Sequence, residues 1–322
     1  MNEQLEMDVV IIGGGPAGMS AALVLGRARK RVAVIDAGLP RNRVTRESHG
    51  FLTRDGIEPG EFRRIAREEI AAYPSVRFVD EHVVAAAGSD GDFTVTTAQG
   101  LAFHSKKLLF AVGMKDLPLD VDGLSEVYGK SAFVCPYCDG WELRDQPLVL
   151  IAKGSRALHL AKTIAGWTDH FTLCTDGDDE WTEEEREDLR QHGVPVFTAL
   201  IQRIESHDGM VKHVQLEDGT EVPCSGIFFA PKLATGSDLP QKMGCQITDA
   251  GTLVVDALGK TSVPGIYSAG DSATDKYQLI LAAALGSMAA AAMNGELLAE
   301  AWESGKEGYF PLSTTCLLGT GE

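Results

Sequence analysis

The sequence contains few basic residues for its size, and this shortage restricts what the protein can bind. Of its 322 residues, 29 are Lys or Arg and 46 are Asp or Glu, so the formal net charge is −17. Nucleic acids and anionic membrane surfaces are bound mainly through clustered Lys and Arg. We therefore predict neither a nucleic-acid partner nor a membrane partner.

The sequence also lacks an opening basic segment followed by an apolar run, so no signal peptide is expected. The longest apolar stretch, residues 279–293, is rich in alanine and too short to span a bilayer, and we expect it to form a buried helix. A hydrophobic content of 44% is enough for an ample core, and two domains are expected. These observations predict a soluble, cytoplasmic protein.

Cysteine is scarce, and only two of the six cysteines lie close together. Cys135 and Cys138 form a CxxC motif, whose thiols can close a small disulfide ring and open it again, which stores two electrons. The motif alone is also compatible with half of a zinc site, but no second CxxC completes one, and no metal site is predicted. The other cysteines are expected to be small buried apolar residues: Cys174, Cys224, Cys245 and Cys316.

A glycine-rich turn follows the first apolar run of the chain. Residues 8–12 read as a strand, a helical segment follows through Ala28, and a second strand, residues 31–35, leads to Asp36. This is a GxGxxG pattern within a βαβ unit that closes with an acidic residue, which is typical of a dinucleotide-binding site. The candidate binding residues of the turn are Gly13, Gly15, Pro16, Ala17 and Gly18.

The three glycines of this pattern have different predicted roles. We expect Gly13 to allow a tight turn, Gly15 to let the backbone approach a pyrophosphate, and Gly18 to let helix and strand pack closely. The helix N-terminus would offer free N–H groups to the phosphates, and Asp36 would accept hydrogen bonds from the adenosine ribose. The pattern alone does not distinguish FAD from NAD.

A second, altered nucleotide pattern follows later in the chain. Residues 148–151 read as a strand, followed by a turn, a helical stretch and a further strand, residues 170–174. In the turn, Ala152 replaces the first glycine of GxGxxA, whereas Gly154 and Ala157 remain. We therefore predict a second βαβ unit with a mildly defective turn.

The residues after the second strand of this unit are acidic rather than basic. An NADPH site needs Arg or Lys there for the 2′-phosphate. This chain has Asp176, Asp178, Asp179 and Glu180. NADPH is therefore disfavoured, whereas NADH remains an alternative because an acid suits a free 2′-hydroxyl. Loss or weakness of nucleotide binding is slightly favoured over a working NADH site.

Together, the two nucleotide patterns and residues 135–140 resemble the low-molecular-weight thioredoxin reductase family of FAD-dependent pyridine nucleotide–disulphide oxidoreductases over almost the whole chain. The resemblance implies an α/β fold with two Rossmann-like domains, the second inserted into the first. The FAD-binding domain would comprise residues 1–117 and 247–322. The NAD(P)-binding-like domain, which carries the CxxC motif, would comprise residues 118–246. A homodimer is also implied.

Some residues depart from the pattern of that family. Tyr277-Gln278 stands where the family has an Arg-Gln pair, and the basic NADPH signature is absent. Residues 41–43 and 49–52 are similar to a branch of thioredoxin-reductase-like proteins. That branch lies near the dithiol oxidases of gliotoxin- and holomycin-type compounds, and near ferredoxin-linked or diflavin reductases that lost NADPH binding.

The resemblance also implies cofactor contacts outside the first turn. Residues 261–271 would form a strand whose final aspartate binds the ribityl chain of FAD, and residues 110–113 would form a short return strand and turn. A long helix over residues 278–301 would point its N-terminus at the flavin. The additional cofactor residues are Ala111, Gly113, Gly270, Asp271 and Gln278.

For the dithiol motif, the resemblance implies that Cys138 lies against the flavin and that Cys135 exchanges with the substrate. Asp139 would act as general acid or base for the thiolate, a role that needs partial burial to raise its pKa toward neutrality. The alternative for Asp139 is a turn-forming residue before Gly140. Residues 309–322, which include Cys316, would fold over an active site or end as a frayed terminus.

These expectations predict an FAD-dependent thiol–disulfide oxidoreductase that shuttles electrons between flavin and the Cys135/Cys138 pair and does not use NADPH efficiently. As a reductase, it would take electrons from NADH, ferredoxin or another flavin and pass them to a thioredoxin-like protein or a small disulfide. One alternative is an O2-dependent oxidase that forms a disulfide in a small dithiol. Another is a flavin-containing redox sensor.

Overall fold

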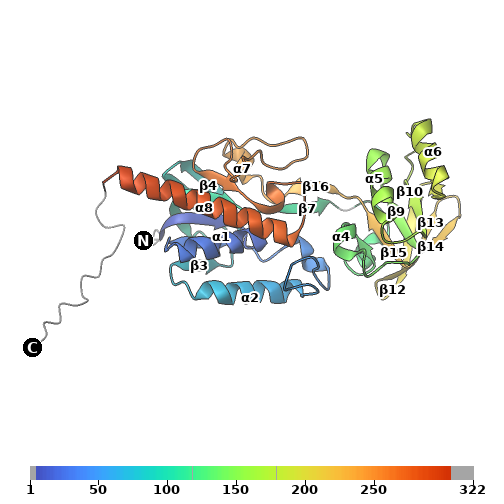
Figure 1. Cartoon of the computed structure of the whole chain (residues 1–322), viewed down its shortest axis with the longest axis horizontal. Helices are drawn as coiled ribbons and strands as arrows, with labels where there is room; N and C mark the ends of the chain where they lie inside the picture. The colour runs from blue at the N-terminus through green and yellow to red at the C-terminus, as the bar shows by residue number, and fades with distance from the viewer. Residues whose placement is uncertain (1–4, 118, 179, 306–322) are drawn as a thin grey trace, which may run out of the picture.

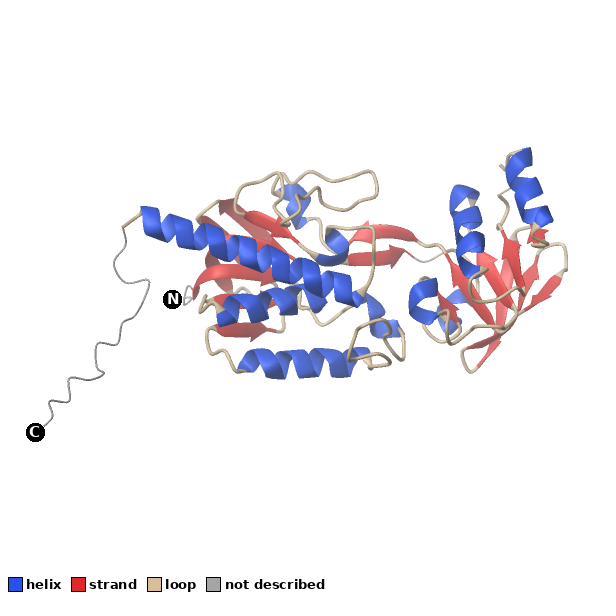
Figure 2. Ribbon diagram, in the orientation of Figure 1, coloured by secondary structure: helices blue, strands red, loops and turns tan. Residues whose placement is uncertain are grey.

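The structure is a computed structural model and describes residues 5–117, 119–178 and 180–305. Figures 1 and 2 show two α/β units of unequal size, joined by a narrow pair of strands. The predictions made for Asp179, for Cys316 and for residues 309–322 lie outside the described residues.

A seven-stranded sheet forms the centre of the larger unit, which we name the first domain. Its order is β3-β2-β1-β6-β5-β4, and β17 pairs with the end of β6. Strands β1, β2, β3, β6 and β17 are parallel, whereas β4 and β5 are antiparallel to their neighbours. The bounds are β1 Leu5–Ile12, β2 Val32–Ile35, β3 Val76–Val79, β4 Val83–Ser89, β5 Asp92–Thr97, β6 Ala102–Phe110 and β17 Ile266–Ser268.

Three helices cover one face of this sheet and share a hydrophobic core with it: α1 (Pro16–Arg27), α2 (Pro59–Ala71) and α8 (Leu279–Glu303). All of β2 and the last five residues of β1 are buried, as expected for parallel strands covered on both faces. A Cβ at Gly286 of α8 would overlap the carbonyl oxygen of Ala17 in α1. The two helices therefore pack with their backbones in close approach.

A five-stranded parallel sheet forms the centre of the smaller unit, which we name the inserted domain. Its order is β11-β10-β9-β15-β8, and a three-stranded antiparallel sheet, β12-β13-β14, packs beside it. The strand bounds are β8 Ala132–Phe133, β9 Leu148–Ile151, β10 Phe171–Cys174, β11 Val196–Phe197, β12 Ile201–His207, β13 Met210–Leu216, β14 Glu221–Pro223 and β15 Gly226–Phe229. The helices are α3 Leu124–Val127, α4 Pro136–Asp139, α5 Gly154–Ile164 and α6 Glu183–Gln191.

The chain crosses between the domains through two antiparallel strands, β7 (Met114–Leu117) and β16 (Lys232–Thr235). The short helix α7 (Leu239–Lys242) follows β16 in the first domain. The predicted α/β fold, with one domain inserted into the other, is confirmed. The predicted boundaries at residues 117/118 and 246/247 stay predictions.

The elements predicted near the C-terminus differ in length from those observed. Residues 261–271 do not form one strand, because Pro264 and Gly265 make a turn and the strand β17 begins only at Ile266. A proline cannot donate to a sheet ladder, and Gly265 has a φ of +76°. The return strand predicted at 110–113 ends at Phe110, where it closes the nine-residue strand β6.

Helix α8 is longer than the apolar stretch that predicted it. It has 25 residues and, by length and composition alone, is long enough to cross a membrane, but only 28% of its most apolar window is buried. The helix predicted over residues 278–301 is therefore confirmed to within two residues, whereas the expectation that the apolar stretch 279–293 is buried holds for only one side of the helix. One side of α8 packs on α1, and the opposite side is exposed.

Candidate active site

The first glycine-rich turn lies between β1 and α1, where the parallel strands of the first domain end. Gly13 has a φ of +107°, and a Cβ there would overlap the carbonyl oxygen of Ala111. A Cβ at Gly18 would overlap the carbonyl oxygen of Gly13. Both positions therefore require glycine. A Cβ at Gly15 would meet no atom within 4 Å, so the turn faces open space at the N-terminus of α1.

Asp36 follows β2 directly and lies beside this turn. Arg63 of α2 forms an ion pair with Asp36, whose side chain is only 12% exposed. Burial raises the pKa of Asp36, but hydrogen bonds from the backbone of Gly14 and from Arg63 outweigh burial and hold the pKa below its ordinary value. Asp36 is therefore a carboxylate at neutral pH and can accept hydrogen bonds from hydroxyl groups.

The predicted cofactor residues from the C-terminal part of the chain lie at the same edge of the sheet. Parallel pairing aligns the ends of β1, β6 and β17, because Ile12 pairs with Phe110 and Phe110 pairs with Ser268. Gly270 has a φ of +77°, and Asp271 follows it in a 3-10 turn. Burial raises the pKa of Asp271, and the nearby Arg41 opposes that rise.

The remaining predicted residues also follow strand ends or precede helices. Ala111 comes directly after β6 and donates its N–H to the carbonyl oxygen of Ile12 at 2.8 Å. Gly113 has a φ of +63° and begins the crossing to the inserted domain. Pro16 is the first residue of α1, and Gln278 immediately precedes α8. The edge thus combines a free helix N-terminus with two carboxylates, which suits a dinucleotide that carries hydroxyl groups and phosphates.

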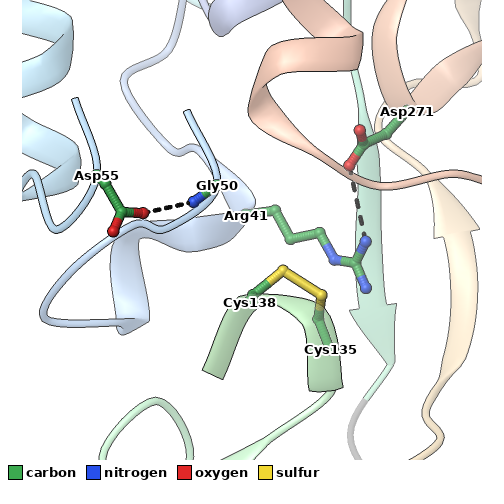
Figure 3. The surroundings of a disulfide bond; sticks show 6 residues. All are labelled: Arg41, Gly50, Asp55, Cys135, Cys138 and Asp271. Carbon is green, nitrogen blue, oxygen red and sulfur yellow. Dashed lines mark hydrogen bonds and ion pairs between the residues drawn. A yellow bond between two sulfur atoms is a disulfide. The ribbon is translucent and has the colours of Figure 1, made fainter. Parts of the chain in front are cut away.

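Cys135 and Cys138 are joined by a disulfide, with 5.3 Å between their Cα atoms. Pro136–Asp139 forms the one-turn helix α4, and the N–H of Cys138 donates to the carbonyl oxygen of Cys135 at 3.0 Å. Figure 3 shows that the disulfide faces the part of the first domain that carries Arg41 and Asp271. The dithiol turn and the predicted cofactor edge therefore meet at one place.

Asp139 closes the dithiol helix and is partly buried. Burial raises the pKa of Asp139 to about 7, where it can gain and lose a proton under ordinary conditions. Two nearby groups act on it in opposite directions: His49 lowers the pKa and Glu142 raises it. The burial that the predicted acid–base role requires is thus present.

Arg41 lies near the disulfide, where the chain crosses between the two domains. Its guanidinium makes two hydrogen bonds to Asp116 of β7, at 2.9 and 2.6 Å, and lies 3.6 Å from the carboxylate of Asp271. Tyr128 of the inserted domain donates its hydroxyl to the same Asp116 at 2.6 Å. The guanidinium also lies over the ring of Tyr277, 4.8 Å from its centroid. Arg41, Asp116 and Tyr128 thereby hold the inserted domain against the cofactor edge.

The second glycine-rich turn, between β9 and α5, differs from the first. Gly154 is the third residue after β9, as Gly15 is the third after β1. Its N–H donates to Oδ2 of Asp178 at 2.6 Å. Lys153 forms an ion pair with Asp176 at 3.0 Å. The backbone N–H that would bind a phosphate therefore already donates a hydrogen bond to a carboxylate of the same chain.

Sequence comparison shows which family these features belong to. A model of the family described as pyridine nucleotide-disulphide oxidoreductase matches residues 7–287. The chain belongs to this family. It is an FAD-dependent disulfide oxidoreductase, related to the thioredoxin reductases.

Relatives of this pyridine nucleotide-disulphide oxidoreductase match it over nearly its whole length. The thioredoxin reductase tcpT of Claviceps purpurea is 30% identical over 325 residues, covering 95% of this chain and 98% of its own. An oxidoreductase from Agrobacterium tumefaciens has a TM-score of 0.86 and 38% identity, covering 91% and 99% of the two chains. The structure of HlmI has a TM-score of 0.88 and 34% identity, covering 93% and 95%.

Several residues of the oxidoreductase site were not predicted as site residues. Three contacts form only in the folded chain. They are the ion pair of Arg63 with Asp36, the hydrogen bond of Tyr128 to Asp116 at the domain crossing, and the hydrogen bond of Gly154 to Asp178. The predictions for the other cysteines are confirmed where the structure describes them: Cys174, Cys224 and Cys245 are buried and free.

Proposed function

We propose that the Cys135–Cys138 pair exchanges two electrons with FAD bound along the first-domain edge, and that NADPH is not an efficient electron donor for this protein. Two observations support the proposal together. The disulfide faces the cofactor edge, and the N–H of Gly154 in the second turn is already bound to Asp178. Bound FAD would supply the two-electron partner of the cysteine pair.

The residues that would hold FAD follow from the geometry of the edge. The first turn offers backbone N–H groups to the phosphates, Asp36 would bind the adenosine ribose, and Asp271 would bind the ribityl chain. The full set of proposed cofactor residues is Gly13, Gly15, Pro16, Ala17, Gly18, Asp36, Ala111, Gly113, Gly270, Asp271 and Gln278.

We assign Cys135 to exchange with the substrate, Cys138 to the flavin side and Asp139 to proton transfer. One thiol of a substrate dithiol first gives its proton to water, and its thiolate attacks Sγ of Cys135, breaks the S–S bond and leaves Cys138 as a thiolate. The second substrate thiol gives its proton to Asp139, attacks the substrate sulfur of the mixed disulfide and releases Cys135 as a thiolate, which takes a proton from water. The substrate loses two electrons and two protons. The cysteine pair takes the electrons, and the two protons are accounted for on Cys135 and Asp139.

The direction favoured by Asp178 is that of a dithiol oxidase. If the second turn takes no nicotinamide, electrons would enter from a small dithiol through the Cys135–Cys138 pair, and bound FAD would supply their transfer to O2, which with two protons gives hydrogen peroxide. The other candidate is a reductase that receives electrons from NADH, ferredoxin or another flavin protein and reduces a thioredoxin-like protein. Such a reductase would need an electron donor that either does not use the second turn or displaces Asp178 from Gly154.

The test is dithiol turnover in two cysteine variants. We expect Cys135→Ser and Cys138→Ser each to abolish oxygen consumption with dithiothreitol, because either change removes the disulfide, while bound FAD stays at the wild-type ratio. Cys245→Ser is a matched control, since Cys245 is a buried cysteine that packs in the first-domain core. Turnover retained in both active-site variants would contradict the proposal.

The predicted homodimer and the cytoplasmic location are also proposed here. An apolar stripe on the exposed side of α8 supports the dimer, since its large side chains are the kind that subunit interfaces bury. The stripe consists of Ile280, Met288, Leu298 and Trp302. Sedimentation of wild-type protein and of Trp302→Glu would test it, with a shift to monomer expected for the variant.

A further inference from the structure

The two domains touch through their backbones at one point near the domain crossing. Gly129 of the inserted domain lies against Val44, the last residue of the 3-10 turn η1 (Arg41–Val44) of the first domain. A Cβ at Gly129 would lie only 2.1 Å from the carbonyl oxygen of Val44. The domains are therefore in direct contact here, with no space for a side chain between them.

Buried polar contacts join the domains in the same region. Asp116 of the crossing strand β7 accepts two hydrogen bonds from Arg41, at 2.9 and 2.6 Å, and one from the hydroxyl of Tyr128 at 2.6 Å. The side chain of Asp116 is only 9% exposed, so water competes little for these bonds. We name Arg41, Asp116 and Tyr128 the latch, because they connect the first domain, the crossing strand and the inserted domain. A further contact, 3.6 Å between His49 and Glu142, crosses the same boundary.

The disulfide is partly enclosed while the domains are in contact. Cys135 and Cys138 are both half-buried, and the disulfide faces the first domain (Figure 3). A small dithiol needs to bring only one sulfur atom to Cys135, whereas a folded protein must bring a whole surface to it. A protein would first have to separate the domains, which would break hydrogen bonds to the buried carboxylate of Asp116. Losing such bonds is unfavourable.

We propose that the latch keeps the disulfide against the cofactor edge throughout the redox cycle, and that the substrate is therefore a small dithiol rather than a protein. The proposal rests on the exchange at Cys135 proposed above and specifies the size of the molecule that takes part in it. The cysteine pair gains and loses its electrons without rotation of the inserted domain. Arg41 also lies 3.6 Å from Asp271, so one guanidinium links the proposed FAD-binding edge to the position of the inserted domain.

The test compares a small dithiol with a protein dithiol. FAD-loaded, oxidised protein is mixed anaerobically with dithiothreitol or with reduced thioredoxin, and the reaction is stopped with N-ethylmaleimide. The alkylated fraction of Cys135 is read by mass spectrometry, and the radius of gyration is measured by small-angle X-ray scattering. For wild type we expect rapid alkylation with dithiothreitol, slow alkylation with thioredoxin, and the same radius of gyration in the oxidised and reduced states.

Two variants release the inserted domain by independent routes. Tyr128→Phe removes one hydrogen bond to the charged Asp116, and Gly129→Ala places a methyl group against the carbonyl oxygen of Val44. Arg41 is left unchanged, because it also contacts Asp271. We expect the alkylation rate with thioredoxin to rise in both variants, by about tenfold in Tyr128→Phe, since a hydrogen bond to a charged group changes an equilibrium constant by about that factor or more. The radius of gyration should increase in both.

Matched changes inside single domains should leave both measurements at their wild-type values. Tyr73→Phe also removes a tyrosine hydroxyl bonded to a charged group, because the hydroxyl of Tyr73 accepts a hydrogen bond from Arg27 within the first domain. Gly123→Ala also places a methyl group at a positive φ, +79°, and against a carbonyl oxygen, that of Ile204 within the inserted domain. These controls separate domain contact from general destabilisation.

The outcomes distinguish the latch from the proposed function. An unchanged thioredoxin rate in either latch-releasing variant with bound FAD would overturn the latch alone. So would equal rates in Gly123→Ala and Gly129→Ala, or wild-type protein that reacts with thioredoxin as fast as with dithiothreitol. If Cys135 of the wild type is alkylated after neither dithiol, the proposed exchange at the cysteine pair fails instead.

Discussion

The two glycine-rich turns of this protein begin from the same βαβ pattern but differ in which backbone N–H a carboxylate binds. A Cβ at Gly15 or at Gly154 would meet no atom within 4 Å. In the first turn, Asp36 accepts a hydrogen bond from the backbone of Gly14 and pairs with Arg63. In the second, Gly154 is bound by Asp178. The difference shows that a Rossmann-like turn can keep its fold while its phosphate position is filled by the chain itself. Burial of the strand before each turn maintains the fold, whereas phosphate binding requires a backbone N–H group that is free to donate a hydrogen bond.

The position that ends each pattern shows the same contrast. Gly18 cannot carry a side chain, because a Cβ would overlap the carbonyl oxygen of Gly13. Ala157, its counterpart, carries one and is fully buried. The first turn is thus packed more tightly against its helix than the second.

Gly18→Ala should disable the first turn. The added methyl group would force the turn and α1 apart, and overpacking of this kind destabilises by about 1–3 kcal/mol. We expect the variant to be purified with little bound FAD, measured by visible absorbance. Ala157→Gly is the matched change in the second turn and should cost about 1 kcal/mol with FAD retained. Equal FAD content in the two variants would contradict the comparison.

Asp178→Ser should open the second turn. Its removal frees the N–H of Gly154 for a phosphate, and because a hydrogen bond to a charged group contributes ~1.5–3 kcal/mol, NADH affinity should rise by about tenfold or more. Isothermal titration of both proteins with NADH measures this. Asp249→Ser, an exposed aspartate of the first domain, should change nothing. Wild-type affinity equal to that of Asp178→Ser would show that the turn was never closed.

Asp36→Asn should weaken the first turn in a pH-dependent manner. The pKa of Asp36 is held below its ordinary value, so its carboxylate contributes stability that is present above the ordinary pKa and lost as pH falls through the lowered value. The variant should be less stable than wild type by about 1 kcal/mol at neutral pH, and the difference should shrink in acid. Urea unfolding across the pH range measures it. A difference that grows toward low pH would contradict the assignment.

The sequence was sufficient to predict the elements whose signal is local. The apolar run at 148–151 forms β9 with the predicted bounds. The GxGxxG pattern lies, as predicted, in the turn after a strand, at the edge of the sheet where β1, β6 and β17 end. The turn at Pro264-Gly265 could also be predicted from the sequence, because proline cannot donate a hydrogen bond to a strand ladder. The prediction of one strand over residues 261–271 did not take this into account.

Contacts between distant side chains could not be predicted in the same way. The acidic run after β10 predicted a poor site for a 2′-phosphate through repulsion, but it did not predict the direct hydrogen bond from Gly154 to Asp178. That bond joins residues 24 apart and depends on how the loop closes. His49 and Arg41 lie near the dithiol turn only because of the way the inserted domain is placed beside the first. No local pattern encodes that arrangement.

An anaerobic titration of the FAD-loaded protein shows directly whether a dithiol or a nicotinamide reduces the flavin. NADPH, NADH and dithiothreitol are added in turn while the flavin absorbance is followed. We expect the dithiol to bleach the flavin at near-stoichiometric amounts, NADPH to leave it unchanged, and air to restore the colour with formation of peroxide. Rapid bleaching by stoichiometric NADPH would contradict it, because the second turn would then be open despite Asp178.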